Sequence, residues 1–183
     1  MAQAHRYQAY YCEENIWHLC QEARFEGQEG KVVLISNPTR SCALWYQRAS
    51  PDPLQALLWD YHVIFMAHQD GGWWVWDLDT ALGLPVPFSL YCRATFGPPG
   101  ALPEPYRSQF RVMESAQWVS TLRSDRAHMR DQDGQWLKPP PPWPCIGQGQ
   151  GPGNLSRFID VADPFVGEIM TDEVWRQRFG DGR

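Results

Sequence analysis

The spacing of apolar residues near the beginning of the chain predicts a helix. Between Cys12 and Arg24, apolar side chains recur at intervals of three and four residues, which places them on one face of a helix. Glu13 and Glu14 lie in the first turn, where carboxylates interact favourably with the helix dipole, and Gly27 can end the helix. We therefore expect a helix that begins at Cys12 and turns its apolar face to the core.

Apolar and alternating runs predict an antiparallel sheet. The strongest signal is a hairpin of residues 57–69 and 73–79, joined by a turn with the sequence DGG. Residues 32–36 and 43–47 are predicted to form two further strands, separated by the turn-forming sequence NPTRS, and residues 110–113 a short one.

The second half of the chain predicts short helices and irregular connections. Residues 80–105 are rich in proline and glycine, so an irregular connection is expected there. Short helices are expected at 116–125, 155–161 and 171–179, and loops at the proline run 139–144 and at 147–154. The pattern indicates an α+β protein, an α/β sandwich whose antiparallel sheet is flanked by helices.

Size and composition indicate one globular domain. The chain has 183 residues, of which 43% are hydrophobic and 20% charged, and it contains ten tryptophans. Such a chain can bury a substantial core. We expect one catalytic domain over residues 1–183, with a flexible N-terminus at 1–9, and a monomer.

Charge and cysteine usage exclude several classes of protein. A net charge of −5 argues against a nucleic acid or an anionic membrane as the main partner, and suits a cationic ligand such as a free amino terminus. No apolar run approaches the roughly 20 residues of a membrane span, and the N-terminus lacks the apolar region of a signal peptide. Five scattered cysteines, without a CxxC pair, predict reduced thiols in a cytoplasmic or nuclear protein with no structural metal.

Cys12 is the first candidate for chemistry. A thiol is a weak nucleophile while it is protonated, and a helix N-terminus or a neighbouring imidazolium lowers its pKa. The predicted helix places Cys12 in such a position. A buried structural thiol is the alternative, and this is how we interpret Cys20, which lies on the apolar face.

His62 on the predicted hairpin is the second candidate. A turn centred just before the DGG segment places His62 opposite Asp77, and a turn centred one residue later places it opposite Asp79, with Asp77 on the diagonal. Opposed Cβ atoms lie about 4.5–5.5 Å apart and diagonal ones about 7–8 Å, so either register brings a carboxylate within reach. A His–Asp pair on a solvated face is the alternative. His68 lies on the same strand face as His62 but at the end of the hairpin, where we expect it to be exposed, and His5, His18 and His128 have no comparable neighbours in the sequence.

The order of these residues is typical of cysteine hydrolases. A cysteine at a helix start, a histidine on a strand and an aspartate on the next strand occur in papain-like and transglutaminase-like enzymes, where the carboxylate orients the imidazole that activates the thiol. A different class of function is suggested by PPPPWP, which a binding module can present as a polyproline ligand.

Several short motifs carry a resemblance to a known family. YYCEENIW, VLISN, WDYHV, DLDT, FRV, SDRAHM, DGQW, PPPPWPCI and LSRFI follow one another in this order. Together they resemble the protein N-terminal glutamine amidohydrolase family, from about Tyr10 to Phe179. The departures, a short segment before Cys12 and a variable-looking stretch at 97–105, leave these motifs intact.

The resemblance implies an activity and a triad. Members of this family hydrolyse the side-chain amide of an N-terminal glutamine in proteins or peptides, which gives glutamate and ammonia and feeds the N-degron pathway. Carried over by motif, the nucleophile is Cys12, the base is His62 and the third member is Asp77, in a transglutaminase-like core without a cofactor or metal.

Substrate contacts are expected near the motif residues. The α-ammonium group requires carboxylates or carbonyls, and a pocket must fit the glutamine stem. The candidates for the pocket and its charge are Glu13, Glu14, Trp59, Asp60, Tyr61, Asp79, Asp125 and Trp143. The rival reactions are transfer of the acyl group to an amine, as in transglutaminases, and peptide-bond cleavage.

Overall fold

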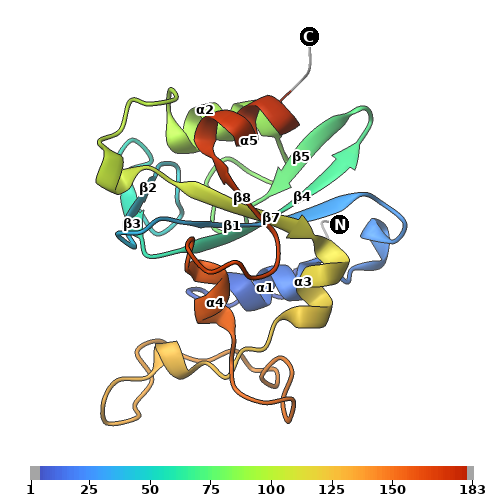
Figure 1. The fold of residues 1–183 in the computed structure, drawn as a ribbon, viewed down its shortest axis with the longest axis vertical. Coiled ribbons are helices and arrows are strands. Elements are labelled where there is room, and N and C mark those ends of the chain that lie inside the picture. Colours follow the sequence, from blue (N-terminus) through green and yellow to red (C-terminus); the bar gives the residue numbers. More distant parts are fainter. Residues whose placement is uncertain (1–4, 181–183) are drawn as a thin grey trace.

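A six-stranded antiparallel sheet organises the protein (Figure 1). The computed structural model describes residues 5–180. The strands, in their order across the sheet, are β6 (Val86–Pro87), β5 (Gly72–Trp76), β4 (His62–Gln69), β1 (Gly30–Ser36), β7 (Gln109–Glu114) and β8 (Glu168–Thr171). Every neighbouring pair is antiparallel.

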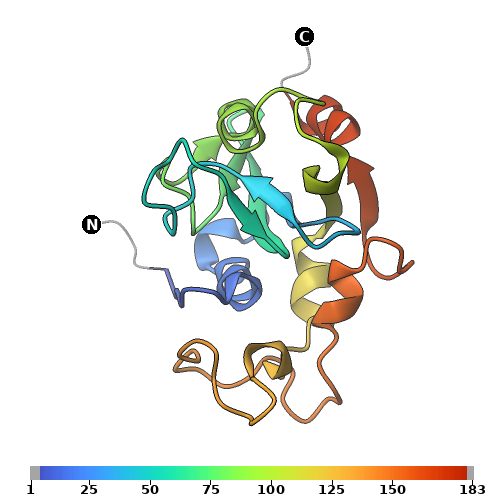
Figure 2. The ribbon, with the colours of Figure 1, turned by 90° about the vertical axis from the view of Figure 1, so that its left-hand side faces the viewer.

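Helices cover both faces of this sheet. On one face lie α1 (Cys12–Leu19), α3 (Ser115–Thr121) and α4 (Leu155–Ile159), and on the other α2 (Phe88–Phe96) and α5 (Asp172–Phe179), as Figures 1 and 2 show from two directions. Short 3₁₀ turns occupy η1 (Ala23–Phe25), η2 (Glu104–Tyr106) and η3 (Ala127–Met129). The expected mixed fold with an antiparallel sheet flanked by helices is confirmed.

The sequence of β1 explains the two layers of helices. Successive side chains of a strand point to opposite faces of the sheet, so a run without polar residues must be buried on both sides. Val32 and Leu34 belong to the core beneath α1, whereas Val33 and Ile35 belong to the core beneath α2. Two cores therefore share one sheet.

The predicted first strand of the hairpin is broken in two. Residues 57–59 form β3 (Leu57–Trp59), which pairs with β2 (Cys42–Leu44) in a separate two-stranded sheet, and β4 begins only at His62. Between them the backbone N–H of Tyr61 donates to the side chain of Asp60 at 3.0 Å, a local bond that competes with strand pairing. The strand expected at 43–47 is likewise reduced to the residues of β2.

Residues 80–105 contain a helix, so the expectation of an irregular connection is wrong there. In α2, the residues Phe88, Tyr91, Cys92, Thr95 and Phe96 are buried, at the spacing of one helix face. Pro87 precedes the helix and Gly97 follows it, both at positions where these residues commonly border helices.

The remaining differences concern element ends. The first helix ends at Leu19 instead of near Arg24, and the turn η1 takes up part of the rest. The strand β8 was not expected, whereas α5 has the expected cap, since the Thr171 side chain accepts from the backbone N–H of Val174. Of the N-terminus expected to be flexible, residues 1–4 lie outside the described part, and residues 5–9 form neither helix nor strand.

Among residues 5–180, the structure contains no helix that is both apolar enough and long enough to cross a membrane.

Candidate active site

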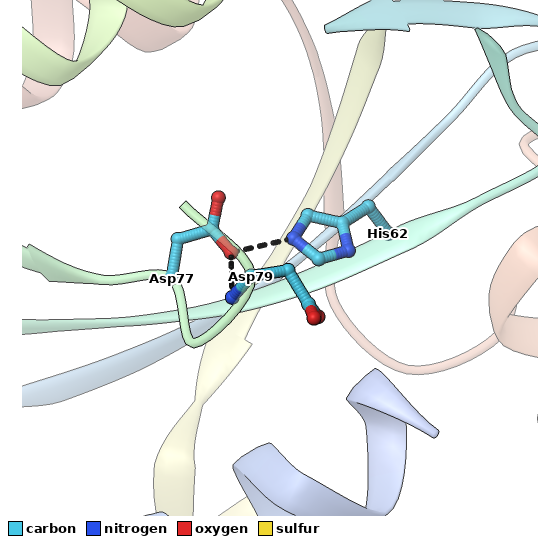
Figure 3. Close-up of side chains that lie close together, drawn as sticks. All are labelled: His62, Asp77 and Asp79. Atoms are coloured by element: carbon cyan, nitrogen blue, oxygen red, sulfur yellow. Dashed lines mark hydrogen bonds and ion pairs between the residues drawn. The ribbon is translucent and has the colours of Figure 1, made fainter. Parts of the chain in front are cut away.

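A buried imidazole–carboxylate pair lies where β4 begins. The ring nitrogen Nε2 of His62 lies 2.8 Å from Oδ1 of Asp77, and both side chains are fully buried (Figure 3). Burial alone would lower the pKa of His62, but the charge and the hydrogen bond of Asp77 outweigh it, so the pKa lies above its ordinary value. The other ring nitrogen, Nδ1, has no hydrogen-bond partner among the described residues.

The hairpin register and the turn that follows it place Asp77. Gln69 pairs with Gly72 and Phe65 with Trp76, so the turn is centred inside the DGG segment, the second of the two expected registers. That register puts Asp77 on the diagonal from His62. Because β5 ends at Trp76, the chain turns at Asp77, whose Oδ1 also accepts from the backbone N–H of Asp79 at 2.9 Å.

Two further groups hold the Asp77 carboxylate in place. Its Oδ2 accepts from the hydroxyl of Tyr91 on α2 at 2.9 Å and from the amide of Gln47 at 3.3 Å. Burial raises the pKa of Asp77, but the charge of His62 and the hydrogen bonds from His62, Asp79 and Tyr91 hold it below its ordinary value. Asp77 is therefore an anion that keeps the Nε2–H tautomer of His62 and leaves the lone pair on Nδ1.

Asp79 is beside this pair but is bonded elsewhere. Its side chain leads away from the Asp77 carboxylate towards the side of α1 (Figure 3), and its Oδ1 accepts from the hydroxyl of Tyr7 at 2.6 Å. Burial raises the pKa of Asp79. Ligand atoms of His62, Asp77 and Asp79 lie within 4.8 Å of one another, the geometry of a possible metal site, but the nitrogen and oxygen that face each other are joined in the His62–Asp77 bond.

Cys12 lies at the first position of α1, close to the start of β4. The backbone of Val63, the residue that follows His62, is near enough to its thiol to lower the thiol pKa, although burial outweighs this effect. Only 5% of the surface of Cys12 is exposed. The expectation that the helix start lowers the thiol pKa is wrong, because burial, and after it the charges of Glu13 and Asp79, raise the pKa well above its ordinary value. The resting sulfur therefore carries its proton.

A cavity of about 500 Å³ opens over Cys12. Trp59 from the end of β3 and Tyr61 from the connection to β4 line it, together with His128 from η3. The Trp59 ring also packs on the His62 imidazole, with centroids 5.1 Å apart and planes inclined by 30°. Arg40 and Lys138 add positive charge to its lining, and Asp60 and Asp125 negative charge. The cavity thus offers an apolar wall and both signs of charge around one thiol.

Glu13 lies behind the wall of this cavity. It is fully buried, and its Oε2 accepts from the hydroxyl of Tyr61 at 2.9 Å and lies 3.8 Å from the sulfur of Cys12. Its Oε1 has no hydrogen-bond partner among the described residues, and the nearest cationic candidate, Nε2 of His128, is 3.6 Å away. Burial raises the pKa of Glu13 to about 7.

Glu14 has a different role from the one expected of it. Its two oxygens accept from Arg126 at 2.8 and 2.7 Å, from Ser124 at 2.8 Å and from the indole of Trp143 at 2.7 Å. Arg126 also donates to the carbonyl of Trp143 at 2.9 Å. The proline run is thereby attached to α1. The side chains of Glu14 and Trp143 bond each other in this connection, and neither lines the cavity.

Asp125 lies in the cavity lining, but its oxygens bond the chain itself. Oδ1 accepts from the backbone N–H of Ala127 at 3.0 Å and Oδ2 from that of Gly153 at 2.9 Å. These bonds lower the pKa of Asp125. Asp125 thus shapes the loop that borders the cavity, whereas Asp60 keeps an exposed side chain at its mouth.

Some groups around the site were not expected from the sequence. The sequence indicates no comparable neighbour for His128, but its Nε2 lies 3.2 Å from the hydroxyl of Tyr61 and 3.6 Å from Oε1 of Glu13. Arg126, Tyr91 and Gln47 were also missed. The motif SDRAHM contained a signal for Arg126 and His128, since both belong to it. Tyr91 and Gln47 carry no comparable signal, because their role depends on α2 and on the chain fold.

Comparison with known proteins connects this geometry to a family. Residues 7–179, nearly the whole chain, match the family described as N-terminal glutamine amidase. The chain belongs to the N-terminal glutamine amidase family. The match includes every residue of the site described above.

Curated relatives of this amidase family extend the match over most of their length. The chain is 38% identical over 181 residues to the protein N-terminal glutamine amidohydrolase of Homo sapiens, which covers 95% of this chain and 87% of the human protein. It is 39% identical over 166 residues to the protein of the same name from Bos taurus, covering 88% and 79%. The Caenorhabditis briggsae protein of that name is 38% identical over 176 residues, covering 94% of both chains.

Proposed function

We propose that this chain hydrolyses the side-chain amide of an N-terminal glutamine in proteins or peptides, releasing ammonia and leaving glutamate. Membership of the amidase family supports the proposal, as do the names of relatives that align over most of both chains. The new N-terminal glutamate would enter the N-degron pathway. The five free cysteines fit a reducing compartment, the cytoplasm or the nucleus. One sheet shared by two cores fits a single catalytic domain, which we expect to act as a monomer.

The observation that carries the mechanism is the buried His62–Asp77 pair, whose Nδ1 has no partner among the described residues and which lies at the start of β4, the strand against which the helix of Cys12 packs. In the proposed triad, Cys12 is the nucleophile, His62 the base and Asp77 the orienting carboxylate. This is the arrangement of a transglutaminase-like or papain-like core. No step requires a cofactor.

The neutral thiol determines how the first step runs. Since burial keeps the proton on the sulfur, Nδ1 of His62 removes it as the sulfur attacks the side-chain carbonyl carbon of glutamine. The resulting oxyanion faces the start of α1, where the backbone N–H of Cys12 is the proposed donor. Asp77 stabilises the imidazolium that forms.

Two proton transfers complete the reaction. The imidazolium protonates the departing nitrogen, ammonia leaves, and a thioester to Cys12 remains. Water then attacks the thioester while His62 takes its proton, and the imidazolium returns a proton to the sulfur as glutamate is formed. Asp60 at the mouth of the cavity and Asp79 beside His62 are the carboxylates proposed to attract the α-ammonium group.

The test is ammonia release from three peptides that begin with glutamine, asparagine or acetyl-glutamine. The wild type should release ammonia from the first only, because asparagine misplaces its carbonyl and the acetyl group removes the positive charge. Cys12→Ala should remove this activity and keep the fold, whereas Cys20→Ala, which removes the thiol directly after the same helix, should stay active. Activity retained in Cys12→Ala would overturn the assignment of the nucleophile.

A labelled amine added to the same assay separates hydrolysis from acyl transfer. Hydrolysis gives only glutamate, whereas transfer gives an isopeptide product in which the amine replaces ammonia. The alternative of a polyproline-presenting module receives no support from the loop itself, since Arg126 and Glu14 hold Trp143 and its neighbours against the domain.

A further inference from the structure

Glu13 is a buried acid that the proposed mechanism does not use. Its neighbour Glu14 is as deeply buried but has a donor for every oxygen, whereas Oε1 of Glu13 has none among residues 5–180. A buried polar atom without a partner is costly, so its retention beside a reactive thiol points to a role in the reaction. The other oxygen of the same carboxyl group, Oε2, lies 3.8 Å from the sulfur of Cys12, so the group is close to the carbonyl carbon that bonds to the sulfur.

The reaction changes the charge at this position. The substrate brings a neutral carboxamide to Cys12, and the product leaves a carboxylate in the same place. We propose that Glu13 discriminates against the product: its carboxylate tolerates the neutral amide of glutamine and repels the carboxylate of the newly formed N-terminal glutamate, so that product leaves as the free anion. The inference rests on the proposed function and assigns Glu13 the task of product release.

Proton exchange gives this proposal a measurable signature. A product carboxylate can remain beside Glu13 only if the two share a proton, so product binding takes up a proton whenever Glu13 is ionised. Burial sets the pKa of Glu13 at about 7. Above that pH the product should lose affinity about tenfold per pH unit, up to the limit set by repulsion between two close carboxylates, on the order of 100-fold.

Other titratable groups face Glu13 and require a control. Cys12 and Glu14 lie on the same helix, Tyr61 and His62 on the β3–β4 side, and His128 on η3. Tyr61 donates to Glu13, and burial lowers the pKa of His128. If His62 or His128 took up the proton instead, the pH dependence would survive the loss of the Glu13 carboxyl group.

The experiment measures binding of two peptides that differ only in their first residue, glutamate or glutamine. Both are titrated calorimetrically, from pH 6 to pH 9, into the full chain carrying Cys12→Ala, which prevents turnover. Titration of the α-amino group affects the binding of both peptides equally, so its effect is absent from the ratio of the two dissociation constants. The dissociation constant of the glutamate peptide, divided by that of the glutamine peptide, should rise about tenfold per pH unit above pH 7. With Glu13→Gln added to the same chain, this ratio should no longer change with pH.

Asp60→Asn is the matched control. It removes a carboxylate from the mouth of the same cavity and leaves Glu13 in place, so the ratio should keep its pH dependence. The wild-type chain provides a second measurement in case Glu13→Gln fails to fold: inhibition of its ammonia release by the glutamate peptide should weaken about tenfold per pH unit above 7, relative to the Michaelis constant.

Two outcomes would overturn the proposal and one would overturn its basis. The proposal would be overturned if both peptides bind and the ratio of their dissociation constants does not change with pH. It would also be overturned if the ratio still changes with pH in the chain that carries Glu13→Gln. A wild-type chain that releases no ammonia from the glutamine peptide would instead refute the proposed function, and the inference with it.

Discussion

The first turn of α1 carries two adjacent buried glutamates with opposite surroundings. Glu14 faces the protein and accepts hydrogen bonds from three side chains, those of Ser124, Arg126 and Trp143. Glu13 faces the thiol, accepts one hydroxyl and keeps an oxygen without a partner. Two equally buried carboxylates therefore differ in what they do: the fully paired Glu14 joins parts of the fold, whereas the incompletely paired Glu13 keeps an oxygen that is free for the role proposed above.

A third buried carboxylate tests how far this comparison extends. Both oxygens of Asp77 accept hydrogen bonds, as those of Glu14 do. The atom without a partner among the described residues belongs instead to the residue that Asp77 binds, at Nδ1 of His62. Asp77→Asn should lower kcat by about 10⁴-fold, since an amide can donate to Nε2 and move the ring proton to Nδ1. Asp79→Asn should lower kcat less, because the Asp79 carboxylate accepts a hydrogen bond from Tyr7 and not from His62.

Steady-state kinetics with the glutamine peptide checks this ranking, and nitrogen NMR of the imidazole reports the tautomer directly. A greater loss of kcat in Asp79→Asn than in Asp77→Asn would show that the contact seen in the structure does not identify the working partner of His62.

Arg126→Met tests the structural role of the fully paired carboxylate, Glu14. The change leaves Glu14 buried without its cation, which typically costs about 3–5 kcal/mol of the free energy of unfolding. Urea unfolding followed by tryptophan fluorescence measures it. Arg157→Met removes an arginine from an exposed pair with Asp163 and should change the free energy of unfolding far less. Equal effects of the two changes would deny the Glu14 network its structural role.

Glu13→Gln has the smallest expected effect, which appears as a pH dependence of stability. Burial raises the pKa of Glu13 to about 7 from its ordinary 4.5, so between these values the folded state holds a proton that the unfolded state has released. The wild type therefore loses stability as the pH rises through this window, by about 3 kcal/mol in all. The difference in the free energy of unfolding between Glu13→Gln and wild type should change by that amount from pH 4.5 to 7.

Urea unfolding of both proteins across this pH range makes the measurement. Tyr61→Phe is a useful companion variant, because it removes the one hydroxyl that Glu13 accepts and should enlarge the effect. A difference in stability that does not vary with pH would mean that Glu13 is ionised throughout in the folded state.

The sequence was informative wherever local pattern determines structure. The hairpin, the helix start at Cys12 and a carboxylate within reach of His62 follow from periodicity and turn residues, and all three appear in the structure. The register alone would have favoured Asp79 as the partner of His62. Asp77 takes that place because β5 stops at Trp76 and the chain turns at Asp77, and a strand pattern cannot show where the ladder ends.

What the sequence could not reveal depends on distant contacts. The apolar face of α2 was present at helical spacing, but the surrounding prolines and glycines concealed it. The burial of Cys12 reversed the expected direction of its pKa, because local position indicated the helix dipole and not the surrounding carboxylates. The pairing of Glu14 with Arg126 joins residues 112 positions apart, which no local pattern encodes.

The same long-range pairing has a consequence for how the chain becomes an enzyme. The thiol, imidazole and carboxylate all belong to the first 77 residues, yet the loop that borders their cavity is attached to α1 through Arg126 and Trp143. During synthesis on the ribosome, the reactive groups therefore exist well before the chamber that receives the substrate. In the proposed mechanism, a working site therefore requires the chain up to Trp143, whose indole donates to Glu14.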